Sequence, residues 1–226
     1  MDWTLHHAHP WDLAPPEAQR LQRRLRRYVR EAPLDWKALR TVAGVDVGFP
    51  KPDTARAAVA VLSFPDLAPV DWAVAEIPTP MEYVPGLLSF RELPAVLKAL
   101  EQLRVRPEVF LVDGQGIAHP RGLGIAAHLG VLLDWPTVGV AKSLLVGHPQ
   151  GLLGETRGST IPLVYRGRVV GMGVRTRDKV KPVWVSIGHR VDLPGAVALV
   201  LRTATRYRLP EPIRAAHRLS KGQTLT

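Results

Sequence analysis

Three segments with strand character follow one another within residues 41 to 77, and only short stretches separate them. Each segment is rich in Val, Ala and other residues that suit a half-buried or buried strand, and the intervening KPD and PDLA sequences favour turns. Connections this short join antiparallel neighbours, whereas parallel strands need a long crossover. The sequence therefore predicts an antiparallel meander formed by residues 41–49, 55–64 and 69–77.

The next part of the chain alternates between helical and strand patterns. Helices are expected over 90–104 and 121–133, and short apolar strands over 108–113 and 136–142. This alternation predicts parallel strands with helices on both faces of the sheet. A meander joined to parallel strands gives an α/β protein with one mixed sheet flanked by helices, and this order of elements is that of the ribonuclease H-like fold.

The remaining segments complete one predicted domain, residues 1–226, since the sequence contains no internal repeat and no flexible linker. An Arg-rich N-terminal helix is expected over about 15–32, where a narrow apolar stripe is surrounded by six arginines. Those arginines are explained equally well by a solvated helix face and by contact with phosphates. Later elements are expected at these ranges: a hairpin at 163–176, a strand at 182–189, and helices at 194–207 and 211–220.

Charge and composition narrow the class of partner. The 30 Lys and Arg exceed the 20 Asp and Glu and give a net charge of +10, which predicts a polyanionic partner such as nucleic acid. The absence of cysteine excludes disulfides and thiolate chemistry, so a metal would have to be held by carboxylates or histidines. With neither an apolar span nor a leader pattern at the N-terminus, we expect a cytoplasmic monomer that does not contact membranes.

Two carboxylates interrupt or end apolar strand segments. Asp46 lies within AGVDVGF, and Asp113 ends FLVD just before a GQG sequence. If the two strands are neighbours, the carboxylates would converge and repel each other unless a cation such as Mg²⁺ lay between them. An Asp that caps the turn after its own strand is the competing explanation for each.

Glu92 is a third candidate ligand, but it has a good alternative role. Ser89 and Glu92 together match the S-x-x-E capping box, in which the Glu would only satisfy backbone N–H groups at a helix start. Pro94 makes the start of this helix ambiguous, so Glu92 could equally project toward the sheet.

The segment GVAKS places Lys142 just past a buried strand, where its charge could meet a phosphate. It resembles the end of a phosphate-binding P-loop, but Ala141 replaces the required Gly and no Gly-rich approach precedes it, so nucleotide triphosphate binding is rejected. Gly114 and Gly116 allow the backbone to approach a ligand closely. The three histidines of the N-terminal HHAHP sequence are expected to have no role.

Several longer blocks together resemble the endonuclease V family, the deoxyinosine 3′ endonucleases. The blocks run in order from about residue 40 to 217: AGVDVGF, EYVPGLLSFRE, FLVDGQGIAHPRGLGIAAHLG, PTVGVAKS, GHRV and YRLPEPIR. The resemblance implies a ribonuclease H-like fold and a repair enzyme that binds DNA containing deoxyinosine. It also implies hydrolysis of the second phosphodiester bond 3′ to the lesion, which leaves 3′-hydroxyl and 5′-phosphate ends.

The resemblance also implies roles for individual residues. Asp46, Glu92 and Asp113 would be catalytic carboxylates that bind Mg²⁺, with Mn²⁺ as a substitute. Lys142 matches the active-site lysine of the family, and His217 matches a position that helps at the metal or the phosphate.

Substrate contacts follow from the same resemblance. Tyr83 matches the tyrosine of the family's P-Y-I-P wedge, although Glu82 and Val84 replace the first Pro and the Ile. The remaining substrate-binding residues expected around the extruded base are Gly114, Gly116, Gly124 and Arg91.

Two alternatives remain open at the level of sequence. One is an inosine-specific ribonuclease acting on single-stranded RNA, which would differ in its response to the 2′-hydroxyl. The other is a basic nucleic-acid-binding protein without catalysis, which would be expected to lack one of the carboxylates.

Overall fold

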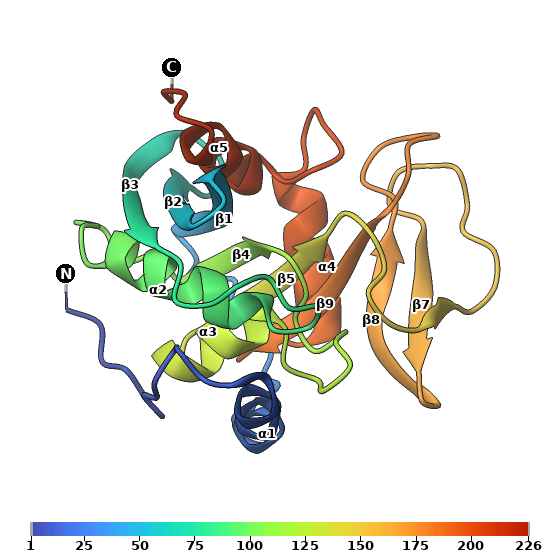
Figure 1. The fold of residues 1–226 in the computed structure, drawn as a ribbon. Coiled ribbons are helices and arrows are strands. Elements are labelled where there is room, and N and C mark those ends of the chain that lie inside the picture. The colour runs from blue at the N-terminus through green and yellow to red at the C-terminus, as the bar shows by residue number, and fades with distance from the viewer. Residues whose placement is uncertain (1, 226) are drawn as a thin grey trace.

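The computed structural model describes residues 2–225 and contains one nine-stranded mixed sheet (Figure 1). The strand order is β3-β2-β1-β4-β5-β9-β8-β7-β6. The strands are β1 Thr41–Lys51, β2 Thr54–Ser63, β3 Pro69–Pro78, β4 Val109–Asp113, β5 Thr137–Ala141, β6 His148–Pro149, β7 Thr160–Tyr165, β8 Arg168–Val174 and β9 Val183–His189.

The predicted mixed sheet is confirmed. β1, β2 and β3 form the antiparallel meander, and β4 pairs in parallel with both β1 and β5. The later strands extend this same sheet, because β9 pairs antiparallel with β5 and carries β8, β7 and β6 beside it. The sheet therefore has an antiparallel part on each side of a short parallel centre.

Helices cover both faces of the sheet (Figure 1). α2 (Leu88–Leu100) and α3 (Ile125–Leu133) pack on one face, in a core that includes Val45 and Val112. α4 (Leu193–Thr203) and α5 (Glu211–Ser220) lie on the opposite face. Across residues 2–225, no helix is long and apolar enough to cross a membrane.

Three helices end earlier than the sequence patterns indicate. The helix expected over 90–104 is α2, which ends at Leu100. The Arg-rich helix expected over about 15–32 is α1, Pro15–Leu25, followed by a 3-10 turn at Arg26–Tyr28, after which the chain becomes extended. α1 packs outside α3 through Ala18, Leu21 and Leu25, which are buried. The helix expected to reach residue 207 ends at Thr203, whose hydroxyl donates to the carbonyl of Leu199 and so competes with continued helical bonding.

Candidate active site

Small residues on β1 allow α5 to lie directly against the sheet. Gly44, Asp46 and Gly48 alternate along β1 and share a face. A Cβ at Gly44 would lie 1.9 Å from the carbonyl oxygen of Pro212, and one at Gly48 would lie 2.9 Å from that of Ser220. The two glycines therefore make room for α5, and Asp46 between them faces the last turns of that helix.

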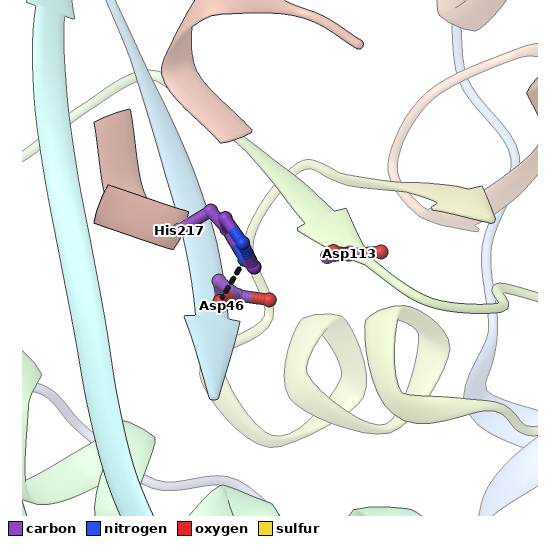
Figure 2. A group of neighbouring side chains, drawn as sticks. All are labelled: Asp46, Asp113 and His217. Atoms are coloured by element: carbon purple, nitrogen blue, oxygen red, sulfur yellow. Dashed lines mark hydrogen bonds and ion pairs between the residues drawn. The ribbon is translucent and has the colours of Figure 1, made fainter. Parts of the chain in front are cut away.

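The strand register brings Asp46 and Asp113 together. Val45 pairs with Val112 in the parallel β1–β4 ladder, so the next residue on each strand, Asp46 and Asp113, lies at the same level and on the same face. The two side chains are only 10% and 11% exposed. Figure 2 shows them on adjacent strands. The sequence predicts that the two carboxylates converge if their strands are neighbours, and the strands are neighbours.

α5 supplies two further polar groups to Asp46. The Nδ1 atom of His217 lies 3.1 Å from Asp46 Oδ2, as the dashed line in Figure 2 marks. The hydroxyl of Ser220 donates to the same oxygen at 2.5 Å. Ser220 did not emerge from the sequence patterns. A signal for it exists, because positions 217 and 220 are three residues apart and therefore share one face of a helix.

Asp46, Asp113 and His217 each offer one ligand atom, and these atoms lie within 4.8 Å of one another. Two buried carboxylates and an imidazole are oxygen and nitrogen donors suited to a divalent metal ion. Bringing two carboxylates this close is unfavourable without a cation. The residues present therefore fit a metal ion.

Glu92 lies outside that group of three but close enough to feel its charge. Its side chain projects from the second turn of α2 and is buried, at 6% exposure. Burial, followed by the negative charges of Asp46 and Asp113, raises the pKa of the Glu92 carboxyl well above its usual range. A buried carboxyl facing two others strengthens the case for a cation at this place.

The capping-box explanation for Glu92 is wrong. The residue that precedes α2 is Leu87, and its cap has no side-chain hydrogen bond. The Ser89 hydroxyl is directed instead to Nδ1 of His128, 2.9 Å away. Glu92 is therefore free of the helix-start role that its spacing from Ser89 suggested.

Lys142 lies next to Asp113, with its Nζ 2.5 Å from Oδ2. Burial raises the pKa of the Asp113 carboxyl, the Lys142 ammonium lowers it, and the Asp46 charge raises it, which leaves the pKa at about 6. Arg208 holds this region in place by donating to the carbonyls of Lys142 and Pro182, each at 2.7 Å. The sequence patterns did not point to Arg208.

A pocket of about 250 Å³ adjoins the carboxylates. Asp113 and Lys142 form part of its wall, and Tyr83, which is 63% exposed, lies at its rim. Gly114 and Gly124 also line it. Gly114 has a φ of +153°, and a Cβ there would lie 2.6 Å from the Ile125 side chain.

Gln115 is a pocket residue to which the sequence assigned no role. Its Nε2 donates to the carbonyl of Ser143 at 3.0 Å, while its Oε1 is buried without a partner within the described chain. An unpaired buried acceptor is costly unless a ligand donates to it. Gln115 therefore offers a hydrogen-bond acceptor in this pocket.

Two residues expected to bind substrate lie elsewhere in the structure. Gly116 is not part of the pocket wall: its N–H donates to Ser186 Oγ at 2.8 Å, and a Cβ there would lie 2.0 Å from the carbonyl oxygen of Ile187 on β9. Arg91 stacks over Phe49, with its guanidinium carbon 4.5 Å from the ring centre, and donates to the carbonyl of Pro52. Arg91 thereby ties α2 to the β1–β2 turn.

Comparisons with known proteins show which family this chain belongs to. The family model for endonuclease V matches residues 23–218. The endonuclease V of Trichormus variabilis is 52% identical over 220 residues, which cover 97% of this chain and 99% of the relative.

Solved structures give the same result. The endonuclease V of Streptomyces avermitilis has a TM-score of 0.89 at 42% identity and covers 94% of this chain and 93% of its own. That of Ciona intestinalis, in complex with a 24mer DNA containing an inosine followed by a ribo-adenosine, has a TM-score of 0.80 at 28% identity and covers 92% and 96%. The predicted ribonuclease H-like fold is thus confirmed, and the chain belongs to the endonuclease V family of nucleases.

Proposed function

We propose that this protein is a metal-dependent repair endonuclease that recognises deoxyinosine in DNA. It hydrolyses the second phosphodiester bond 3′ to the lesion and leaves 3′-hydroxyl and 5′-phosphate ends. The observation that carries the proposal is the convergence of Asp46, Asp113 and His217 beside a pocket with an exposed tyrosine at its rim. The inosine-containing DNA bound by the Ciona intestinalis relative supports this substrate.

The metal of the proposed reaction is Mg²⁺, with Mn²⁺ as a substitute. Asp46, Glu92 and Asp113 would hold it, and His217 would act beside them at the metal or the phosphate. A bound divalent ion supplies a water that ionises near neutral pH and offsets negative charge at the phosphate. Hard oxygen ligands are the donors that Mg²⁺ prefers, which agrees with this ligand set.

The remaining chemistry falls to side chains of this chain. The attacking water oxygen bonds to phosphorus while the P–O3′ bond breaks, and the departing 3′ oxygen takes up a proton. Lys142 lies beside Asp113, so its ammonium can neutralise charge that develops on the phosphate. The ion pair with Asp113 keeps that ammonium at the site before substrate arrives.

Recognition requires the base to leave the stack, at a cost of a few kcal/mol that is smaller for a poorly paired base. Stacking on Tyr83 can offset about 1–3 kcal/mol of that cost. Gly114 and Gly124 would form the wall against the base, Gly116 would support that wall from behind, and Arg91 would act on the substrate only through the β1–β2 turn that it anchors.

A second candidate substrate is single-stranded RNA containing inosine. The DNA bound by the Ciona intestinalis relative carries a ribo-adenosine after its inosine, so that site accepts a 2′-hydroxyl. Matched DNA and RNA strands in competition distinguish the two substrates, because the 2′-hydroxyl is the difference a site senses.

The test is incubation of an oligonucleotide containing one deoxyinosine with the protein and Mg²⁺, followed by mapping of both new ends. We expect a nick one nucleotide beyond the lesion, no nick in the matched undamaged strand, and loss of activity with EDTA or in Asp113→Ala. If the wild-type protein leaves the deoxyinosine strand without that nick, the proposal is refuted.

We also propose that the single domain acts as a monomer in the cytoplasm, and a light-scattering mass near 24.9 kDa tests the monomer.

A further inference from the structure

Five arginines converge on a second depression, outside the pocket described above. An open groove of about 510 Å³ lies between α1, the 117–122 loop and the turn that joins β7 to β8. Its charged and aromatic lining consists of Arg23, Arg26, Arg121, Arg166, Arg168 and Tyr165. We call this depression the arginine groove.

The positive charges of the arginine groove are not neutralised within the protein. Within residues 2–225, none of the five arginines forms a salt bridge. Glu31 acts on Arg26 only from a longer distance. The groove therefore concentrates guanidinium groups that have no salt bridge to a carboxylate, and their positive charge attracts an anion.

The arginines also act on one another. Burial, and then the charge of Arg168, lowers the pKa of the Arg26 guanidinium, while burial and the charge of Arg23 lower that of Arg121. Like charges held this close disfavour the folded protein unless an anion lies between them. Arg26 belongs to the 3-10 turn that follows α1, and Arg168 is the first residue of β8, so the repulsion spans the two walls of the groove.

Contacts within the protein hold two of the groove's arginine side chains, Arg121 and Arg166, in place. Arg121 donates to Gln22 Oε1 and to the carbonyl of Gly86 at 2.7 Å, which fixes its guanidinium at the wall. Arg166 lies over the ring of Tyr165, with its guanidinium carbon 5.1 Å from the ring centre. Arginine forks beside an aromatic ring suit the phosphates and bases of a nucleic-acid strand.

The arginine groove adjoins the pocket that Asp113, Lys142 and Tyr83 line, on the side of that pocket away from the carboxylates. His119 lines both depressions, whereas Asp113 and Lys142 line only the pocket. A strand whose scissile phosphate lies at Asp113 and whose extruded base fills the pocket would next pass His119. Because the proposed cut is on the 3′ side of the lesion, the part of the strand that continues past His119 is the 5′ side.

We propose that the arginine groove binds the sugar-phosphate backbone of the nucleotides 5′ to the lesion and so supplies affinity without contributing to the choice of base. The 5′ assignment rests on the proposed function, whereas phosphate binding by the groove does not. Arg23 and Arg168 are exposed and lie on opposite walls, so replacing them removes charge with little effect on folding.

The experiment compares two single strands with the same sequence 3′ of the inosine. One carries the inosine near its 5′ end, and the other has roughly ten nucleotides before it, a length typical of single-strand binding sites. Binding is measured by fluorescence anisotropy without metal, and cleavage is measured in single turnover with Mg²⁺. Three proteins are compared: wild type, the groove variant Arg23→Gln/Arg168→Gln, and the control variant Lys37→Gln/Arg202→Gln. The control variant loses the same number of positive charges, at exposed residues near the amino end of β1.

We expect the wild type and the control to bind the longer strand more tightly, and the groove variant to lose that gain by roughly tenfold. The slope of log Kd against log salt for the longer strand should fall by about 1.4 in the groove variant, since each single-strand phosphate contact contributes about 0.7. Cleavage of the short strand at saturating protein should be equal in all three proteins.

Two results would overturn the proposal: an equal loss of affinity for both strands in the groove variant, or a loss in the control variant as large as that in the groove variant. Displacement of the longer strand by inorganic phosphate at constant ionic strength would assign the groove to free phosphate and would also overturn it. The binding measurements need neither metal nor cleavage. A protein that binds the longer strand through the groove but leaves inosine strands intact would therefore contradict the proposed function and retain the groove.

Discussion

Ser220 donates its hydroxyl hydrogen to Asp46 across a separation of 174 residues in the chain, with 2.5 Å between the two oxygens. The same carboxylate oxygen lies 3.1 Å from Nδ1 of His217, one turn earlier on α5. Asp46 therefore has one oxygen engaged by α5, which fixes the direction of the carboxylate toward Asp113. A partner such as the Ser220 hydroxyl orients a metal ligand without contacting the metal.

Ser220→Ala should weaken metal binding more than it weakens the chemical step. Loss of the hydroxyl frees Asp46 to rotate, and removal of such a partner typically costs 10- to 100-fold in metal affinity or activity. We expect the Mg²⁺ concentration for half-maximal cleavage to rise at least tenfold, while kcat at saturating Mg²⁺ stays within a few-fold of wild type. A fall in kcat with an unchanged Mg²⁺ requirement would contradict this positioning role. Thermal unfolding confirms that the variant is folded.

Glu92→Gln should make the metal-free protein more stable and the enzyme inactive. The folded-state pKa of Glu92 is raised, so keeping the carboxylate ionised opposes folding above the unfolded pKa of about 4.3. The amide has the same shape and no charge. In EDTA at pH 8 we expect a higher Tm, by about 2–4 °C per kcal/mol relieved, and at least a 100-fold loss of cleavage with Mg²⁺.

The pH dependence identifies the cause of that stabilisation. Below the unfolded pKa the wild-type carboxyl is protonated in both states, so the difference in Tm between wild type and Glu92→Gln should vanish near pH 4. Glu155→Gln removes an exposed carboxylate and is the matched control, for which we expect no gain at pH 8. A Glu92→Gln variant that is less stable than wild type at pH 8 would exclude the electrostatic explanation.

The sequence was sufficient for the centre of the sheet and for the pair of aspartates. Short connections dictate the meander, crossover helices dictate parallel pairing, and the register of β1 and β4 then brings Asp46 level with Asp113. The period of a strand carries this information locally. The antiparallel entry of β9 beside β5 could not be read in the same way, because both faces of β9 are largely buried and its residues fit either direction.

The remaining parts of the site depend on packing between distant segments. Glu92 satisfies the spacing of a capping box as well as that of a buried ligand, and the start of α2 after Leu87 and the hydrogen bond of Ser89 to His128 exclude the capping box. Ser220 and Arg208 act on Asp46 and Lys142 through the placement of α5 and of the segment before it. The three-residue spacing of His217 and Ser220 places both on one face of α5, but no short window of sequence shows that this face meets Asp46.

Mg²⁺ should stabilise the protein at pH 8 and lose this effect as the pH falls through about 6. Asp113 has a pKa of about 6 without metal, and a carboxyl must lose its proton to become a ligand. At 100 times its Kd, a ligand stabilises by about 2.7 kcal/mol, which raises Tm by roughly 5–10 °C for a chain of this length. The measurement is Tm with and without Mg²⁺ at pH 8, 6 and 5. Asp113→Asn should show little shift at any pH, and an equal wild-type shift at pH 5 and 8 would rule out Asp113 as a ligand.

His9, for which no role was expected from the sequence, belongs to a partly buried chain of hydrogen bonds with His128. The Nδ1 of His9 lies 2.8 Å from the carbonyl of Pro10, which can only accept, so this nitrogen carries the hydrogen. The two Nε2 atoms are 2.8 Å apart, so His128 donates and its Nδ1 accepts from Ser89. Burial lowers the pKa of both rings, and each is neutral in this arrangement. The chain fastens the N-terminal segment to α3 and α2.

His128→Gln should therefore reduce the acid sensitivity of the fold. A histidine whose folded-state pKa lies below its unfolded value of about 6.5 takes up a proton on unfolding, so stability falls as the pH drops below 6.5 by up to about 1.4 kcal/mol per pH unit. His119, with a pKa of about 4, adds to this effect down to pH 4, while the raised pKa values of Glu92 and Asp113 act in the opposite direction in both proteins.

In urea unfolding we expect the His128→Gln variant to be less stable at pH 7.5 by about 1–3 kcal/mol, because His9 and Ser89 lose a partner. Its loss between pH 6.5 and 5 should be smaller than that of wild type, whereas His148→Gln, at an exposed position, should follow wild type. Parallel pH curves for wild type and His128→Gln would show that His128 is not held neutral by the fold.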